Sequence, residues 1–262
     1  MLSITHVSKT FNAGTITEKH ALHDINLTLE DGDFVTVIGG NGAGKSTLLN
    51  LIAGVHSCDT GSIVLNGNDI TDMSEYKRAA YLGRVFQDPM MGTAANMEIE
   101  ENLAMALRRG KRRTLRWGIK NAERDIYREK LALLDLGLED RMKSKVGLLS
   151  GGQRQALTLL MATLVKPELL LLDEHTAALD PKTAQKVLDL TEQFVQKDNL
   201  TTFMVTHNMR HAIQYGNRLI MMLEGNIVFD VRGEEKKHLQ VSDLLAKFQT
   251  AKGEINDRML LN

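Results

Sequence analysis

Residues 39–46 read Gly39-Gly40-Asn41-Gly42-Ala43-Gly44-Lys45-Ser46 and directly follow the apolar run Phe34–Ile38. This is the spacing of a phosphate-binding loop between a buried strand and a helix. Glycines let the backbone N–H groups of such a loop approach a phosphate, which side chains would block. The helical pattern that follows, stopped by Gly54, would add N–H donors and partial positive charge. We therefore predict that Lys45 binds the β- and γ-phosphates of a nucleotide and that Ser46 ligates Mg²⁺.

The loop alone leaves several function classes open, because GTPases, kinases, helicases and transport motors share it. A glycine-rich turn without a ligand is the structural alternative. A second signal lies at Leu169–Leu172, an apolar run that ends in Asp173 and Glu174. A buried strand delivers such carboxylates to the carboxyl edge of the sheet, where open α/β folds bind ligands. Asp173 would hold Mg²⁺ and Glu174 would act as general base, unless they form only an acidic strand end in solvent.

The pattern along the chain predicts an α/β fold. Short apolar runs typical of buried strands are Phe34–Ile38, Ile63–Leu65, Leu169–Leu172, Thr202–Val205 and Leu219–Leu223, and helical patterns occupy Gln153–Val165, Pro181–Gln196 and Met209–Tyr215. Strands that alternate with helices favour a mainly parallel sheet. Residues 2–10, 22–30 and 62–70 instead alternate polar and apolar side chains around turns, which favours an antiparallel β subdomain. Residues from about 90 to 150 predict an inserted α-helical subdomain.

Composition excludes several classes of protein. The 32 Lys and Arg and 33 Asp and Glu give a net charge of −1, so no general attraction to nucleic acid follows. The single cysteine, Cys58, forms no internal disulfide. The amino terminus lacks the pattern of a secretory signal, and no apolar run reaches the roughly 18 residues that span a bilayer. We expect a cytoplasmic protein.

Two further segments stand out by composition. Residues 108–120 carry basic side chains, no acidic ones and the one tryptophan, Trp117. This stretch is either a contact for anionic lipid headgroups or a solvated basic surface. After Val241 we expect a short amphipathic helix and then a polar tail over 253–262.

Further motifs resemble those of the ATP-binding cassette (ABC) ATPases, from about residue 2 to residue 235. Leu149-Ser150-Gly151-Gly152-Gln153 resembles the family signature, Gln87 in Val85-Phe86-Gln87 its Q-loop, and Ala178-Leu179-Asp180 its D-loop. His207 stands where the switch histidine is expected. One departure is His175, because proline usually follows the catalytic glutamate; we expect a change in loop rigidity rather than in chemistry.

The resemblance implies a P-loop NTPase core with a mainly parallel sheet, and an ABC ATPase domain over 1–235 with a C-terminal helix and tail over 236–262. It implies ATP and Mg²⁺ as cofactors. The residues implied to contact nucleotide are Phe11, Gly39, Asn41, Gly42, Ala43, Gly44, Lys45, Ser46, Thr47, Ser150, Gly151, Gly152, Gln153 and Asp180. Ser46, Gln87 and Asp173 would ligate Mg²⁺, and Glu174, His207 and Gln87 would serve hydrolysis. Packing is the alternative for Phe11.

The implied partners are a second copy of the chain, with ATP held between the copies, and integral membrane permease subunits at the cytoplasmic face. The resemblance also implies a substrate-binding protein as a partner and no nucleic acid. Import of a small solute such as an amino acid is the favoured function. Export, and a membrane regulatory complex that does not transport, remain the alternatives. Met90 and Met91, beside Gln87, would contact the permease or pack in the core.

Overall fold

The computed structural model describes residues 1–111 and 118–260. The chain divides into two compact units. The first unit comprises Met1–Glu75 and Thr201–Asn262, and the second comprises Tyr76–Leu200. The phosphate-binding loop belongs to the first unit and the signature segment to the second.

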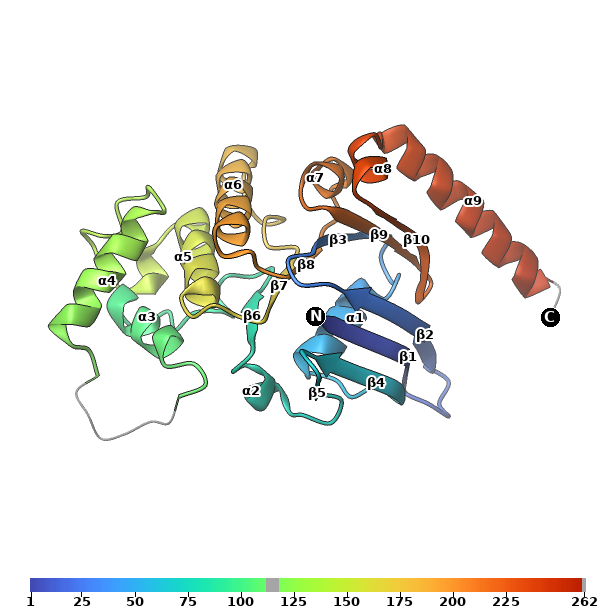
Figure 1. The fold of residues 1–262 in the computed structure, drawn as a ribbon, viewed down its shortest axis with the longest axis horizontal. Helices are drawn as coiled ribbons and strands as arrows, with labels where there is room; N and C mark the ends of the chain where they lie inside the picture. The colour runs from blue at the N-terminus through green and yellow to red at the C-terminus, as the bar shows by residue number, and fades with distance from the viewer. Residues whose placement is uncertain (112–117, 261–262) are drawn as a thin grey trace. The chain divides into compact units, whose positions relative to one another are not determined.

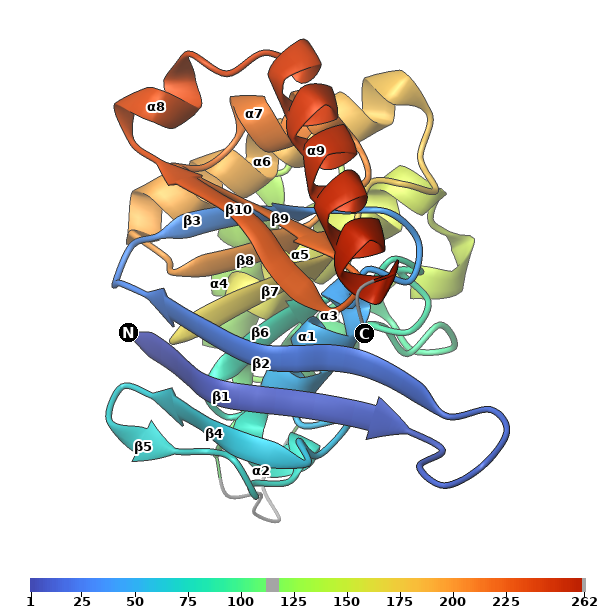
Figure 2. The same cartoon turned by 90° about the vertical axis from the view of Figure 1, so that its right-hand side faces the viewer.

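An antiparallel sheet forms one layer of the first unit. Its strands are β1 (Leu2–Phe11), β2 (Lys19–Leu29), β4 (Thr60–Leu65) and β5 (Asn68–Asp69), in the order β2-β1-β4-β5. Each neighbouring pair is antiparallel, and Figure 2 shows β2, β1 and β4 side by side. The antiparallel β subdomain predicted from residues 2–10, 22–30 and 62–70 is therefore confirmed.

A second group of strands in the first unit is mainly parallel. It contains β3 (Phe34–Ile38), β8 (Thr202–Val205), β9 (Arg218–Leu223) and β10 (Asn226–Arg232), in the order β10-β9-β3-β8. β3 pairs in parallel with both β8 and β9, and β10 is antiparallel to β9. All residues of β3, β8 and β9 are buried, which explains why these strands read as continuous apolar runs.

Four helices complete the first unit: α1 (Lys45–Ala53), α7 (Met209–Gln214), α8 (Glu234–Lys237) and α9 (Val241–Leu260). α1 ends where predicted, at Gly54, whose φ of 82° is left-handed. α9 is longer than the expected short helix and continues through residues 253–260, where a polar tail was expected. One glycine destabilises a helix interior by only about 1 kcal/mol, and no proline follows Gly253 to end the helix.

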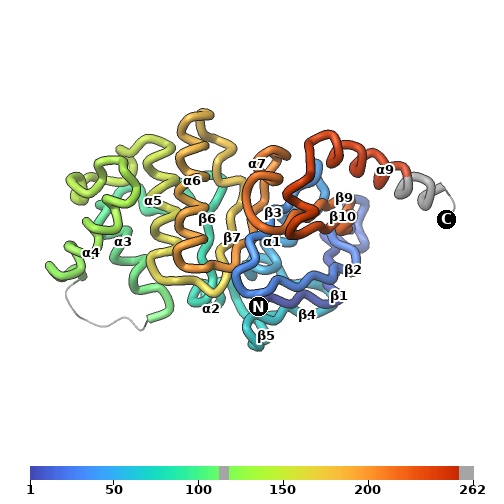
Figure 3. The backbone as a smooth tube through the Cα atoms, turned by 45° about the horizontal axis from the view of Figure 1, so that its top comes forward, coloured from blue at the N-terminus to red at the C-terminus, as the bar shows by residue number. Residues whose placement is uncertain are grey.

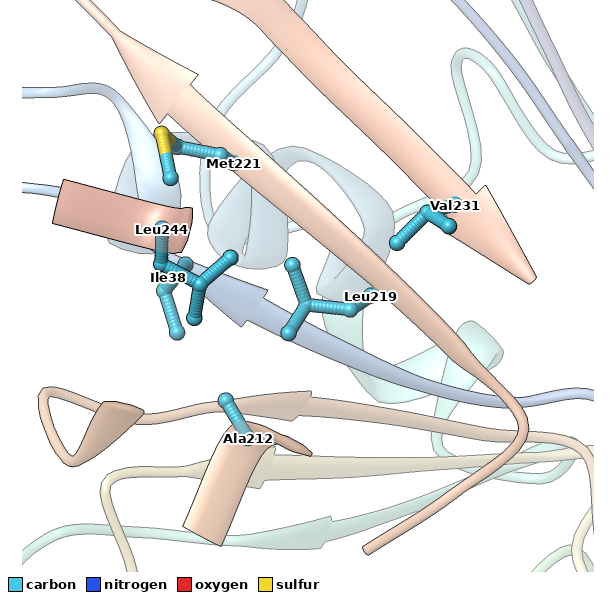
Figure 4. Close-up of a cluster of buried hydrophobic side chains, with 6 residues drawn as sticks. All are labelled: Ile38, Ala212, Leu219, Met221, Val231 and Leu244. Carbon is cyan, nitrogen blue, oxygen red and sulfur yellow. The ribbon is translucent and has the colours of Figure 1, made fainter. Parts of the chain in front are cut away.

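A hydrophobic cluster joins α9 to the strands of the first unit. Figure 4 shows its buried members, Ile38, Ala212, Leu219, Met221, Val231 and Leu244. Leu244 belongs to α9, and Phe248, one turn further along, packs against the same cluster while partly exposed. The amino-terminal half of α9 is therefore anchored by burial of apolar side chains.

The second unit contains two parallel strands and several helices (Figure 1). Its elements are α2 (Glu75–Arg78), which straddles its start, β6 (Leu82–Val85), α3 (Ile99–Leu107), α4 (Asn121–Ala132), the 3₁₀ turn η1 (Val146–Leu148), α5 (Gly151–Thr163), β7 (Leu169–Asp173) and α6 (Pro181–Asp198). β6 runs parallel to β7. α5 and α6 lie side by side in Figure 3. α3 and α4 lie in the segment expected to be helical.

Two arginines of the basic stretch make internal contacts. Arg108 donates to the carbonyl of Ala104 at 2.8 Å and pairs with Glu123 at 3.0 Å. Arg109 donates to the carbonyls of Ala162, at 2.9 Å, and Val165 near the end of α5. Residues 112–117, which include Trp117, lie outside the described residues. Within 1–111 and 118–260, no helix is both long and apolar enough to cross a membrane.

Candidate nucleotide site

The backbone path of the phosphate-binding loop requires glycine at two positions. Gly39 has a φ of 155°, and a Cβ there would lie 2.3 Å from the carbonyl oxygen of Met222. Gly44 has a φ of 98°, and its Cβ would lie 2.8 Å from the carbonyl oxygen of Ala21. Both contacts are shorter than real Cβ atoms make, so any side chain would displace the loop.

Lys45 and α1 give the loop its positive character. The Lys45 side chain is only 5% exposed, and its Nζ donates to the carbonyls of Gly39 at 2.8 Å and Gly40 at 3.0 Å. Among the described residues, no side chain caps the first turn of α1. Its amides and the exposed Ser46 hydroxyl are thus placed to meet phosphate and a metal ion.

His207 lies at the same sheet edge as the phosphate-binding loop. Val205, at the end of β8, pairs with Val37 of β3, and the Thr206 amide donates to the Val37 carbonyl at 3.1 Å. His207 follows and is exposed. The structure therefore places the expected switch histidine beside the strand that leads into the loop.

Phe11 has neighbours that support both interpretations of its role. Its half-buried ring meets His56 edge-on, with ring centroids 5.2 Å apart. Across the sheet it pairs with Lys19, whose Nζ lies 3.7 Å from the position a Cβ would take on Gly42. Sequence reasoning missed Lys19, because the strand register that brings it to the loop contains bulges.

In the second unit, parallel pairing brings Gln87 and the two acids to one edge. Val85 pairs with Leu172, so β6 and β7 end together. Gln87, exposed, lies two residues beyond the end of β6, while Asp173 is the last residue of β7. Asp173 Oδ2 lies 3.9 Å from the Arg84 guanidinium. The predicted placement of Asp173 at a strand end is confirmed.

The turn after β7 has an unusual backbone. Glu174 has a φ of 46°, in the left-handed region that non-glycine residues rarely adopt, and such strain concentrates at functional sites. His175 is 3% exposed and its Nε2 bonds Thr191 Oγ1 of α6 at 3.1 Å. His175 thus restrains the turn by a hydrogen bond where the family has proline, and it faces the helix rather than solvent.

The signature segment starts α5 with reciprocal capping. Ser150 Oγ accepts from the Gln153 amide at 3.2 Å, and Gln153 Oε1 accepts from the Ser150 amide at 3.1 Å. Ser150 and Gly151 are exposed, whereas Gly152 is buried. A Cβ on Gly152 would lie 2.0 Å from Thr183 Cγ2, so this glycine lets α5 and α6 pack closely.

Asp180 caps the neighbouring helix. Its carboxylate accepts from the Thr183 amide at 3.1 Å, and hydrogen bonds from Thr183 lower the pKa of Asp180. A cavity of about 380 Å³ lies between the two helix starts, lined among others by Ser150, Gln153 and Lys182. The signature residues and the first turn of α6 therefore border one cavity.

Hard oxygen donors suit Mg²⁺, which keeps several waters and takes few protein ligands beside phosphate. The Ser46 hydroxyl and the Asp173 carboxylate are donors of this kind. Within residues 1–111 and 118–260, no group of three or more His, Cys, Asp and Glu side chains gathers as a metal cluster. Each of these donors, taken within its own unit, is of the type that could bind a metal arriving with a nucleotide.

Comparison with known proteins agrees with this geometry. The family model described as ABC transporter matches residues 22–177. The tyrosine transport ATP-binding protein of Clostridioides difficile is 45% identical over 251 residues, which are 96% of this chain and 100% of that protein. The spermidine/putrescine import ATP-binding protein PotA of Haemophilus ducreyi is 33% identical, over 99% of this chain and 66% of its own length.

Solved structures show the same fold. The ATP-binding cassette MJ0796, in a dimeric post-hydrolysis state bound to ADP and Pi, has a TM-score of 0.76 and 28% identity, covering 88% of this chain and 98% of that one. The fold is that of a P-loop NTPase with an antiparallel subdomain and inserted helices. This chain belongs to the ABC transporter family, as an ATP-binding protein that hydrolyses ATP.

Proposed function

We propose that the chain is the ATP-hydrolysing subunit of an importer for an aromatic or similar amino acid. The observation that carries the proposal is the 45% identity to a tyrosine transport ATP-binding protein along nearly the whole of both chains. ABC transporter subunits without a spanning helix need a separate membrane partner. We infer that this chain docks on permease subunits from the cytoplasmic face and that a substrate-binding protein delivers the solute.

We propose a separate role in phosphoryl transfer for each site residue. Lys45 and the loop amides bind the phosphates, and Phe11 stacks on adenine. Ser46, Gln87 and Asp173 hold Mg²⁺, which would neutralise phosphate charge. Glu174 polarises the attacking water and His207 orients it against the γ-phosphate. The strained backbone at Glu174 and the shared sheet edge of His207 and the loop support these assignments.

We further propose that two copies hold ATP between them. The Ser150 hydroxyl and the Gly151 amide, exposed at the start of α5, would donate to the γ-phosphate bound by the other copy, and Asp180 would lie near that contact. The dimeric state of the related cassette MJ0796 supports this arrangement. We assign the ATPase domain to residues 1–235 and the C-terminal helix to the remainder.

The test is copurification followed by reconstitution. Tagged chain is purified in mild detergent with its membrane partner, and the complex is placed in vesicles with a candidate binding protein. We expect tyrosine or a related amino acid to stimulate ATP hydrolysis several-fold, and spermidine to have no effect. The Lys45→Ala complex controls for contaminating ATPases. Stimulation by spermidine, or net movement of solute from the ATPase side of the membrane to the opposite side, would refute amino-acid import.

A further inference from the structure

Arg84 lies near the proposed metal-binding carboxylate of Asp173 and against the ring of Phe86, the residue before Gln87. It belongs to β6, in register with Leu171 of β7, and its Nη2 lies 3.9 Å from Asp173 Oδ2. The side chains of Arg84 and Asp173 are only 15% and 18% exposed. Because little water screens the pair, the guanidinium charge acts strongly on the carboxylate.

An aromatic platform fixes the position of this guanidinium. The Arg84 Cζ lies 4.4 Å from the centroid of the Phe86 ring, within the range of a cation–π contact. Phe86 is held in turn by Gln155 of α5, whose Nε2 donates to the Phe86 carbonyl at 3.2 Å. Gln155 is 1% exposed. The helix that begins at the signature thus supports the residue on which Arg84 stacks, one position before Gln87.

We propose that Arg84 is a positioning residue that holds the Asp173 carboxylate and competes with Mg²⁺ for it. The proposal rests on the role of Asp173 as a Mg²⁺ ligand. A cation at 3.9 Å stabilises the carboxylate while no metal is bound. If Asp173 holds a Mg²⁺ ion that arrives with ATP, its carboxylate would have to serve the ion while the like-charged guanidinium stays close. Arg84 therefore weakens the gain in nucleotide affinity that Mg²⁺ provides.

The experiment compares nucleotide binding with and without the metal. The probe is N-methylanthraniloyl-AMPPNP, which is not hydrolysed, and the quantity is the ratio of its Kd in EDTA to its Kd in excess Mg²⁺. Arg84→Met keeps an apolar chain over Phe86 but removes the charge, so the ratio should rise about tenfold, the scale of a nearby opposite charge. Arg84→Lys keeps the charge and should restore a ratio near that of the wild type. Arg84→Gln provides a second neutral variant if Arg84→Met does not fold.

The Asp173→Asn variant tests the metal role of Asp173 separately from the role of Arg84 that rests on it. If Asp173 holds Mg²⁺, the ratio of the Kd in EDTA to the Kd in Mg²⁺ should fall toward one in the Asp173→Asn variant. A collapsed ratio in Asp173→Asn together with an unchanged or lower ratio in the neutral Arg84 variants would overturn the role of Arg84 alone. A wild-type ratio in Asp173→Asn would overturn the metal role of Asp173 itself.

Discussion

Phe248 of α9 lies against Gly40 of the phosphate-binding loop: a Cβ on Gly40 would be 3.8 Å from Phe248 Cζ. The same phenylalanine packs on the hydrophobic cluster that holds Leu244. The C-terminal helix therefore touches the loop that binds phosphate, and the second loop position is bounded by an aromatic ring.

Phe248→Ala should reduce both stability and ATP affinity. Removing a half-buried phenylalanine should lower the free energy of unfolding by about 1–2 kcal/mol, less than the roughly 3–5 kcal/mol of a fully buried one. Loss of the ring beside Gly40 should weaken ATP binding a few-fold. Urea unfolding and fluorescent nucleotide binding measure the two effects. Leu245→Ala, in the same helix but 48% exposed, should change neither; equal effects in both variants would show that the contact with Gly40 does not matter.

Gly44→Ala should lower the free energy of unfolding by more than its left-handed backbone angle alone would cost. A left-handed alanine costs about 1 kcal/mol, and the contact of its Cβ with the Ala21 carbonyl at 2.8 Å adds to this. Gly67→Ala is the matched control, because Gly67 has a φ of 79° but nothing within 4 Å of its Cβ position. We expect Gly67→Ala to lose about 1 kcal/mol in urea unfolding and Gly44→Ala about 2 kcal/mol more. Equal losses would mean that the loop tolerates a side chain at Gly44.

Lys236 should make stability depend on pH. Burial lowers the pKa of this lysine from 10.5 to about 8, and its Nζ donates to the carbonyls of Tyr215 and Gly216. Between these two pH values the unfolded chain binds more protons at Lys236 than the folded chain does, so the unfolding free energy rises with pH. From pH 7.5 to 9.5 the rise should be about 2 kcal/mol.

Lys236→Met removes this titration and isolates its effect. The difference in unfolding free energy between wild type and Lys236→Met should change by that amount across the same pH range, measured by urea unfolding. Lys237→Met, whose exposed ammonium pairs with Glu234 at 2.7 Å, should leave the slope as in the wild type. A wild-type slope in Lys236→Met would assign the pH dependence to another group.

The sequence was most informative where burial is complete. The runs Phe34–Ile38 and Thr202–Val205 match β3 and β8 residue for residue, because strands covered on both faces are mostly apolar. β6 and β10 were missed. β6 reads Leu-Gly-Arg-Val, with a glycine and an arginine among four residues, and β10 is half exposed along most of its length. Glu224 and Gly225, which both have positive φ, form the turn between β9 and β10. Gly225 is the turn signal in the sequence that could have revealed this hairpin.

The candidate site could be predicted only where chemistry follows from neighbours in sequence. The loop spacing predicted Lys45, the apolar run before it predicted Asp173, and the resemblance to the family signature predicted Ser150. Lys19, Arg84 and Phe248 depend on strand register or on the docking of a distant helix, which local patterns do not encode. For His175 the sequence predicted only a change in loop rigidity, and the structure adds its hydrogen bond to Thr191.

The most direct test of the proposal that two copies hold ATP between them uses the Glu174→Gln variant. This change should leave ATP affinity unchanged but slow hydrolysis by roughly 10²-fold or more, because a positioned base is lost. Size-exclusion chromatography with light scattering, in Mg²⁺ and ATP, should then show a dimer that Lys45→Ala in the same background abolishes. A Glu174→Gln protein that binds ATP at wild-type affinity and still elutes as a monomer would contradict the account.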